Sequence, residues 1–330
     1  MTIAPRVRVV RRPVHGVLLL DKPLGLSSND ALQKVKWLMR AEKAGHTGTL
    51  DPLATGVLPL CFGAATKFSA LQLEAIKTYE AVAVLGVKTA TGDAEGDVIE
   101  TRAVNVTQAD LDRVQAQFTG PISQVPPMYS ALKKDGKALY EYARAGITVE
   151  RELRNVVIYK LNISFASVEY AQAAIKIVAT VSKGTYIRTL GEDIGEALDC
   201  GAHLSALRRT ETGSLGIDKA VSLLQLETMG EAERMACLQP VESLLQGHGT
   251  VMLDSDDAGR FLSGLRRRVK MSDAEQVAVY GPGAVSATGT TGDSPRTLLG
   301  VAHIAGGELI PDRLLSALEI EQILSKDFNK

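Results

Sequence analysis

The chain contains few cysteines and no metal-binding pattern. Only three cysteines occur among its 330 residues, namely Cys61, Cys200 and Cys237. Because they are few, odd in number and far apart in sequence, they argue against a disulfide framework. The CxxC and HxxxH spacings of structural metal sites are also missing. We therefore expect a protein of the reducing cytoplasm that holds no structural metal.

A long apolar run is missing as well. No stretch reaches the roughly 18 residues that a membrane-spanning helix needs. The N-terminus is basic and then apolar, as in a signal peptide, but its apolar part, residues 16–20, is too short and is followed at once by Asp21 and Lys22. We interpret this segment as a solvated arm that leads into a buried strand, and we expect no membrane association.

Nucleotide-binding signatures are the third absence. The sequence contains neither GxGxxG nor GxxxxGKS/T, which disfavours the folds that bind dinucleotide cofactors or nucleoside triphosphates. The composition, 45% hydrophobic and 23% charged, is that of a folded globular protein. Its length allows one large domain or two.

Charge is balanced overall but unevenly distributed. The formal net charge is −1, yet residues 1–50 contain nine Lys or Arg against three acidic residues. Further basic clusters occur at 133–137, 208–209 and 266–268. Such clusters either follow a phosphate backbone or form ordinary solvated surface, and the sequence leaves both interpretations open.

Local patterns predict both helices and strands in the first two thirds of the chain. Residues 27–30 form a capping sequence ahead of an apolar helical stripe, which predicts a helix ending near Gly45. Thr107 and Asp110 form a capping-box pattern for another helix. Residues 78–85 and 173–181 have strand character, and a third helix should end near Gly201. This irregular alternation favours an α+β fold.

Three later regions differ in character. Residues 121–154 combine prolines, basic residues and tyrosines, which indicates an excursion from the core that touches a ligand. Residues 226–249 become acidic and lose their pattern, as in a linker. From about residue 250, short runs between Gly, Pro and Asp predict a small domain composed largely of strands.

The stretch GHTGTLDPLATGVLPL, residues 45–60, contains one full charge, Asp51. The pair Asp51-Pro52 is typical of a helix start, since Asp caps helices and Pro suits the first helical position. The surrounding polar loop favours a functional role instead, because glycines such as Gly56 let a backbone approach a ligand closely. His46 is likewise either a hydrogen-bonded structural residue or a contact to a ligand.

The stretch KGTYIRTL, residues 183–190, supplies a complementary cation. Tyr186 and Arg188 are two positions apart, so an extended backbone presents both to the same side. An arginine there can pair with a carboxylate and keep it ionised. The alternative is a structural ion pair elsewhere. By pattern alone, Tyr79 is a half-buried strand residue and Lys22 belongs to a strand end.

Several stretches of the chain together resemble one family, the bacterial TruB tRNA pseudouridine synthases. They are GVLLLDKPLGLSS, AGHTGTLDPLATGVLPLCFGAATKF, KTYEA, TGDAEGD, QVPPMYSALK, SKGTYIRTLGEDIGEAL and CGAHLSALRRT. The match covers roughly residues 14–215 in order, and GHTGTLDPLATGVL is highly specific to this family. The resemblance implies isomerisation of the uridine at position 55, in the T loop of tRNA.

The resemblance also implies the architecture. We expect an α+β pseudouridine synthase fold over residues 1–248, with a mixed, mainly antiparallel central sheet flanked by helices. An insertion near 121–154 should close over the T arm of the RNA. Residues 249–330, where the match is weaker, should form a small β-rich, PUA-like RNA-binding domain.

By position in these motifs, the resemblance assigns the catalytic carboxylate to Asp51. Arg188 matches the arginine that pairs with it, and Tyr186 matches an active-site tyrosine. The resemblance thus gives the single carboxylate in residues 45–60 a catalytic role. Changing the uracil atom that is bonded to ribose C1′ from N1 to C5 is redox-neutral and consumes no water. The reaction therefore requires one carboxylate, as nucleophile or general base, and no cofactor.

Four further residues are assigned to substrate binding by the same resemblance. His46 matches a histidine that contacts the rearranged T loop, and Tyr79 matches a tyrosine that stacks on the target base. Leu207 falls where a leucine lines the uracil pocket. Lys22 lies in the family's KP motif, whose role is more structural.

The expected partner is the T arm of tRNA, bound by a monomer that needs no guide RNA. Two other functions would share parts of this sequence pattern. A tRNA-folding chaperone would bind the RNA with secondary or lost catalysis, although the complete set of Asp51, Tyr79 and Arg188 speaks against loss. An Asp-dependent RNA glycosidase would use the same carboxylate but release free uracil.

Overall fold

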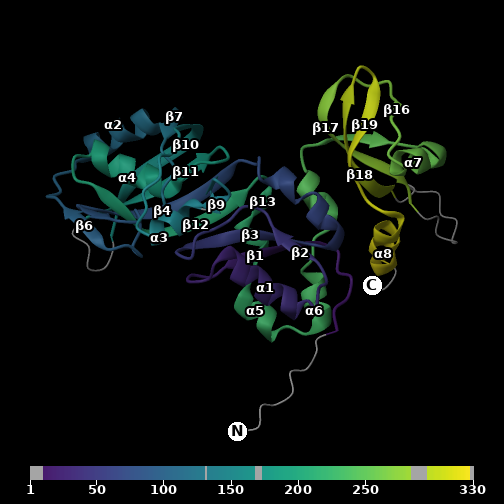
Figure 1. The fold of residues 1–330 in the computed structure, drawn as a ribbon, viewed down its shortest axis with the longest axis horizontal. Helices are drawn as coiled ribbons and strands as arrows, with labels where there is room; N and C mark the ends of the chain where they lie inside the picture. Colours follow the sequence, from purple (N-terminus) through teal and green to yellow (C-terminus); the bar gives the residue numbers. More distant parts are fainter. Residues whose placement is uncertain (1–9, 131, 168–172, 284–295, 328–330) are drawn as a thin grey trace, which may run out of the picture.

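The computed structural model describes residues 10–130, 132–167, 173–283 and 296–327. Most of the N-terminal arm, residues 1–9, lies outside the described part. From Gly16 onward the expected buried strand is present. Figure 1 shows two parts, a large one that contains the N-terminal three quarters of the chain and a small one that contains the last strands.

A mixed ten-stranded sheet forms the large part. Its main path, in spatial order, is β14 (Val221–Ser222), β1 (Gly16–Lys22), β3 (Ala54–Phe62), β12 (Ala202–Thr212), β4 (Lys77–Leu85), β11 (Ala174–Val181), β10 (Arg154–Ala166) and β7 (Gly120–Gln124). Two short strands join it, β2 (Ala44–His46) beside β3 and β13 (Leu215–Gly216) beside β12. The pairs β1–β14 and β3–β12 are parallel and the other pairs antiparallel. The expected mixed, mainly antiparallel sheet is confirmed.

Helices cover one face of this sheet. They are α1 (Ser28–Leu38), α2 (Gln108–Phe118), α4 (Ile187–Ala197), α5 (Leu223–Thr228) and, near α1, α6 (Glu231–Ala236). Their apolar residues, such as Val35, Val114 and Leu190, are fully buried against the inner side chains of β1, β3, β4, β10, β11 and β12. Burial of this apolar surface is the main force that holds the layers together.

Local capping predictions are confirmed at both helix starts. The Ser27 side chain accepts a hydrogen bond from the Asp30 amide at the start of α1, and Thr107 with Asp110 forms a capping box at α2. The expected end of α1 near Gly45 is wrong. The helix stops at Leu38, because Arg40 adopts a left-handed conformation with φ of 51° that ends it.

The C-terminal sheet is built from five strands. In spatial order they are β15 (Gly249–Met252), β17 (Ala274–Pro282), β18 (Arg296–Ala305), β19 (Glu308–Leu314) and β16 (Arg267–Arg268), accompanied by α7 (Ser255–Leu262) and α8 (Ala317–Asp327). The expected β-rich C-terminal part is present. Its curled sheet is consistent with a PUA-like fold.

The two sheets share a buried apolar layer. Val17, Leu19 and Val57, on the face of the large sheet opposite the helices, belong to the same buried cluster as Ala278 and Leu298 of the C-terminal sheet. Lys67 also forms an ion pair with Glu319 of α8, at 2.5 Å. Removal of the C-terminal sheet would therefore expose apolar surface of the large part.

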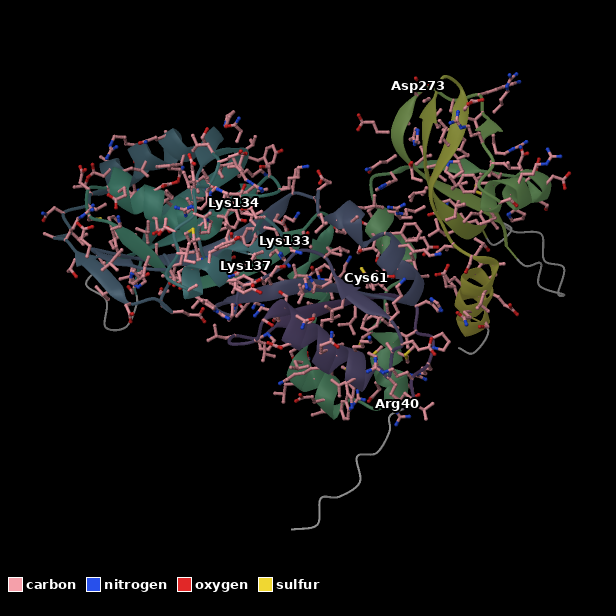
Figure 2. The ribbon with its side chains drawn as sticks, in the orientation of Figure 1. Arg40, Cys61, Lys133, Lys134, Lys137 and Asp273 are labelled. Carbon is pink, nitrogen blue, oxygen red and sulfur yellow. The ribbon has the colours of Figure 1, made fainter. Side chains whose placement is uncertain are left out.

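The excursion expected at 121–154 begins only after a further strand of the large sheet. Residues 120–124 form β7, which pairs with β10 at the edge of the large sheet, so the part that leaves the sheet is 125–153. It contains a short hairpin of β8 (Lys133–Lys134) and β9 (Lys137–Ala138), followed by α3 (Leu139–Arg144). Figure 2 shows Lys133, Lys134 and Lys137 gathered on this hairpin. A second small hairpin consists of β5 (Val87–Thr89) and β6 (Val98–Thr101).

Candidate active site

Asp51 lies in a tight loop between β2 and β3 and does not cap a helix. The chain bends at Pro52 and Leu53 and enters β3 at Ala54, so the interpretation of Asp51-Pro52 as a helix start is wrong. The loop is anchored from outside. The Ser28 hydroxyl both accepts from the Leu50 amide, at 2.7 Å, and donates to the Leu50 carbonyl, at 3.0 Å.

Gly56 has a structural role rather than the ligand contact expected for it. Its φ is +100°, and a Cβ there would lie 2.1 Å from the Arg209 carbonyl oxygen. Only glycine lets β3 approach β12 this closely. The approach holds the end of the Asp51 loop against the strand that carries Leu207.

Asp51 faces Arg188, which also binds a second carboxylate. The Arg188 guanidinium lies 2.9 Å from an Asp51 oxygen and 3.3 Å from an Asp93 oxygen. It donates further hydrogen bonds to the carbonyls of Thr91, at 3.0 Å, and Tyr129, at 2.5 Å. Arg188 is only 5% exposed, so these four partners fix its position. The Arg188–Asp51 ion pair considered from the sequence is present.

Burial and the charge of Arg188 shift the pKa of Asp51 in opposite directions. Its pKa is raised above the usual value, mainly because burial disfavours the charged form, while Arg188 lowers it and Asp93 raises it. About 40% of the side chain remains accessible, which leaves the carboxylate open to a substrate. The arrangement provides an accessible carboxylate with a fixed counter-charge.

A pocket of about 590 Å³ opens above this ion pair. Five of the seven candidate residues line it, namely Asp51, Tyr79, Tyr186, Arg188 and Leu207. They come from the β2–β3 loop, β4, the start of α4 and β12. Residues that are distant in the sequence therefore line one cavity, which has apolar side chains at its sides and the Asp51–Arg188 ion pair at its base.

Tyr186 and Arg188 reach this pocket by a different route from the expected one. Tyr186 has an extended backbone, but Ile187 already begins α4, so Arg188 lies in the first helical turn. The side-chain amide of Gln124 accepts from the Tyr186 amide, at 3.1 Å, and donates to its carbonyl, at 3.2 Å. These two bonds fix the start of the helix that carries Arg188.

The other two candidate residues, His46 and Lys22, do not line the pocket. His46 lies on β2, where its Nδ1 is buried and has no hydrogen-bond partner among the described residues. Lys22 is fully buried, and its ammonium group donates to the carbonyls of Pro23, at 2.9 Å, and Leu26, at 2.6 Å. Burial lowers the Lys22 pKa to about 8, against the opposing effect of Asp51. Lys22 thus stabilises the loop between β1 and α1 through these two hydrogen bonds.

Sequence reasoning missed Asp93. It lies in the polar glycine loop after β5 and is buried, with its carboxylate on Arg188 and its Oδ1 bound by the Thr91 hydroxyl at 2.5 Å. The signal available was a loop rich in glycine that contains three carboxylates, Asp93, Glu95 and Asp97. Nothing local in that loop shows that it packs against α4.

The sequence places Arg209 in a basic cluster that either follows a phosphate backbone or forms solvated surface, and the structure contradicts both interpretations for this residue. Arg209 is 1% exposed, and its guanidinium donates to the carbonyls of Val57, at 2.8 Å, and Gly48, at 3.3 Å. Its neighbour Arg208 forms an ion pair with Asp21 at 2.8 Å. Both arginines therefore serve the protein interior or its own carboxylates.

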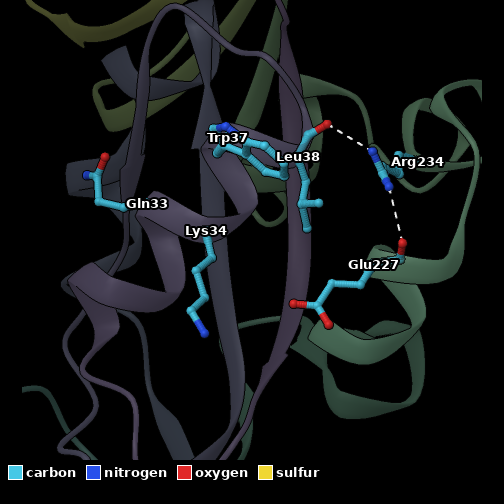
Figure 3. A pocket seen from close by; sticks show the side chains of 6 residues that line it. All are labelled: Gln33, Lys34, Trp37, Leu38, Glu227 and Arg234. Carbon is cyan, nitrogen blue, oxygen red and sulfur yellow. Dashed lines mark hydrogen bonds between the residues drawn. The ribbon is translucent and has the colours of Figure 1, made fainter. Parts of the chain in front are cut away.

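A second hollow, of about 780 Å³, lies away from these residues between α1 and the α5–α6 region (Figure 3). It contains Trp37, which is 62% exposed, and Arg234, which donates to the carbonyls of Leu38 and Glu227 at 3.2 and 3.4 Å. The Arg234 bonds tie two helical segments together. Although larger, this hollow contains none of the candidate residues and is not the candidate active site.

Comparison with known proteins identifies the family of this arrangement. Residues 36–187 match the N-terminal domain of the TruB family pseudouridylate synthases, and residues 188–246 match the tRNA pseudouridylate synthase B C-terminal domain. The chain belongs to the TruB family. It is therefore a pseudouridine synthase. The two matches end before the five-stranded C-terminal sheet.

Curated relatives are similar over nearly the whole chain. The chain is 66% identical to tRNA pseudouridine synthase B of Verminephrobacter eiseniae (strain EF01-2), over 98% of this chain and 96% of the relative. It is 57% identical to tRNA pseudouridine synthase B of Ralstonia nicotianae, over 92% of this chain and 95% of the relative. The similarity to the Verminephrobacter eiseniae relative therefore extends over most of the residues of the C-terminal sheet.

Solved structures share the fold. The chain resembles the structure of a Cbf5-Nop10-Gar1 complex, with a TM-score of 0.64 and 25% identity over 92% of this chain and 85% of the other. It resembles the archaeal box H/ACA sRNP Nop10-Cbf5 complex with the same TM-score and 23% identity, over 93% and 89%. The expected pseudouridine synthase fold is confirmed.

Proposed function

We propose that Asp51 is the catalytic carboxylate with which this synthase converts uridine 55 in the T loop of tRNA to pseudouridine. The observation that carries the proposal is the accessible Asp51 carboxylate, held by the buried Arg188 at the base of a pocket with apolar and aromatic walls. Membership of the TruB family and the names of the close relatives support tRNA as the substrate.

The reaction breaks the bond between ribose C1′ and uracil N1 and forms a bond between C1′ and C5. The C5 proton is lost and N1 gains a proton, so atoms and electrons balance without a cofactor or water. Asp51 acts on this rearrangement as nucleophile or general base. Arg188 keeps the carboxylate ionised in surroundings that would otherwise raise its pKa further.

The pocket walls suit an extruded base. A base within an RNA stack cannot reach a carboxylate in a pocket, so the target uridine must rotate out of the T loop. Tyr79 supplies an aromatic face for stacking, and Leu207 supplies an apolar wall that excludes water. Tyr186 lines the same cavity, with its backbone fixed by Gln124.

His46 lies outside the pocket, and we assign it to the T loop from which the uridine has left. Its buried Nδ1 without a partner among the described residues supports a role other than a structural hydrogen bond. Lys22 supports the site from within the protein. Residues 125–153 touch the pocket through Ser130 and Leu132, which supports RNA contact by this excursion.

The domain division is also part of the proposal. Residues 1–248 carry the chemistry, and residues 249–330 form a PUA-like domain that adds RNA contacts.

The protein acts as a monomer without a guide RNA, in the cytoplasm, where its three free cysteines stay reduced. Among the described residues, no helix is long and apolar enough to cross a membrane.

One experiment tests the function against its alternatives. Unmodified tRNA labelled with tritium at uracil C5 is incubated with the purified protein, and both tritium and free uracil are measured. The proposal predicts tritium release without free uracil. Free uracil would show a glycosidase, and binding without release of either would show a binding module or folding chaperone.

A further inference from the structure

Four cationic side chains line the catalytic pocket, and three of them are committed to the protein itself. Arg188 and Arg209 bind the partners described above. Lys77, which is 8% exposed, donates to the carbonyls of Gln72, Leu73 and Ala75 at 3.2, 2.7 and 2.6 Å. These three cations are therefore not available to an incoming anion.

Arg154 is the fourth, and it differs from the others. It lines the pocket but is exposed, and its side chain has no hydrogen bond or ion pair with any described residue. An arginine without a carboxylate partner at the mouth of a pocket is available for a phosphate, which its planar guanidinium binds through two parallel hydrogen bonds.

The position of Arg154 is fixed relative to the active site. As the first residue of β10, it pairs with Gln124 on β7, and the Gln124 side chain binds the backbone of Tyr186. Arg154 and Tyr186 also line the same pocket. The cation thus lies on the Tyr186 side of the pocket mouth.

We propose that Arg154 binds one of the two phosphates that flank the flipped uridine and so holds the nucleotide in the pocket. The proposal rests on the proposed function, because it needs a uridine in this cavity. The uracil enters past the apolar walls while its phosphates stay at the mouth, where Arg154 is the uncommitted cation among the described pocket residues. Arg154 is thus a substrate-binding residue that supplies affinity and register.

The test uses synthetic T-arm stem-loop RNAs labelled with tritium at C5 of the target uridine. One RNA is unmodified, and two others carry a neutral methylphosphonate in place of either flanking phosphate. Each RNA is assayed with the wild type and with Arg154→Ala. On unmodified RNA, Arg154→Ala should lower kcat/KM by about 10- to 100-fold, the loss expected for hydrogen bonds to a charged group. Arg154→Lys keeps the positive charge but lacks the planar guanidinium that forms two parallel hydrogen bonds, so its loss in kcat/KM should be smaller.

The combination of variant and RNA decides the proposal. At one of the two positions, the methylphosphonate should cost the wild type about as much as Arg154→Ala costs on unmodified RNA. On that RNA, Arg154→Ala should then lose no more than about twofold further, since the contact is already absent. If the loss caused by Arg154→Ala were the same on both methylphosphonate RNAs as on unmodified RNA, the two effects would be independent at both positions. That result would overturn the proposal.

Two controls separate this result from other causes. Lys160→Ala removes a charge from the same strand, about 20 Å along it from Arg154, and should change kcat/KM by less than about twofold. Melting temperatures of the variants should match the wild type, because both side chains are exposed. If the wild type released no tritium from unmodified RNA, the proposed function itself would fail, an outcome distinct from multiplicative losses by an active enzyme.

Discussion

In the catalytic pocket the charged side chains other than Arg154 have partners within the protein and Arg188 is buried, whereas on the C-terminal sheet the basic side chains near β16 lie largely at the surface. Arg188 and Asp93 are 5% and 2% exposed and bind each other. On the β16 side of the C-terminal sheet, the Arg266 side chain is 64% exposed, and Arg268 and Lys270 are exposed as well.

This difference in exposure suits the two regions to different functions, chemistry in the pocket and RNA binding on the C-terminal sheet. A charge out of contact with water interacts strongly with its neighbours, so its position and its partners' pKa values can be tuned for chemistry. An exposed charge is screened by salt and moves freely, which suits contacts to a phosphate backbone. Substitutions of the buried charges around Asp51 should therefore change turnover and its pH dependence, and substitutions on the C-terminal sheet should change affinity.

Arg188→Gln should have the largest effect among the residues that support Asp51. The pKa of Asp51 is already raised by burial, and loss of Arg188 removes the group that lowers it most. Because the ionised carboxylate is the active form, activity falls as pH drops through this pKa. The acidic limb of kcat should therefore move to higher pH, and kcat at neutral pH should fall by roughly 10²- to 10³-fold. An acidic limb at the wild-type position would contradict this electrostatic role.

Asp93→Asn should have a smaller effect with the opposite pH shift. Asp93 is a like charge that raises the pKa of Asp51, so its removal should move the acidic limb to lower pH. Arg188 keeps its bonds to the carbonyls of Thr91 and Tyr129, so the loss in kcat should be limited to roughly tenfold to fiftyfold. The measurement is kcat against pH, with Asp93→Glu as the variant that keeps the charge. Shifts of both variants in the same direction would contradict the account.

Neutralising the C-terminal surface should affect only affinity. Deletion of this sheet is a poor test, since it would uncover Val17 and Leu19. The triple variant of Arg266, Arg268 and Lys270 to Ala leaves the core intact and retains Arg267, which forms an ion pair with Asp257. We expect KM for tRNA to rise about fivefold to tenfold with kcat within about twofold. The slope of log affinity against log salt should become shallower by about two. A large fall in kcat would place chemistry in this sheet.

The sequence predicted the features that depend on neighbouring residues. Both capping sequences, at Ser27 and Thr107, start helices where expected, because the capping bond involves residues only three apart. The alternating strands and the β-rich C-terminal part also follow from local pattern. The end of α1 was placed too late, since a left-handed Arg40 carries no sequence signal as clear as a glycine.

Features that depend on distant contacts were not predictable from local pattern. Asp51-Pro52 has the local form of a helix start, but Ser28, from another element, holds the loop in a different conformation. Asp93 becomes part of the site only because its loop packs against α4. Arg209 reads as surface charge, yet its strand buries it. The family resemblance, rather than composition or periodicity, pointed to Asp51 and Arg188 as partners.

The most direct test of the central claim is Asp51→Asn, with melting temperature, tRNA affinity and tritium release measured on one preparation. An amide is a poor nucleophile and a poor base, so kcat should fall by roughly 10³-fold or more, at least about 4 kcal/mol. The fold should survive, since Asp51 lies in a loop and caps no helix. Affinity for tRNA should hold, because one negative charge near phosphates is removed. Turnover within about tenfold of the wild type, in a folded protein that binds tRNA, would show that Asp51 is not the catalyst.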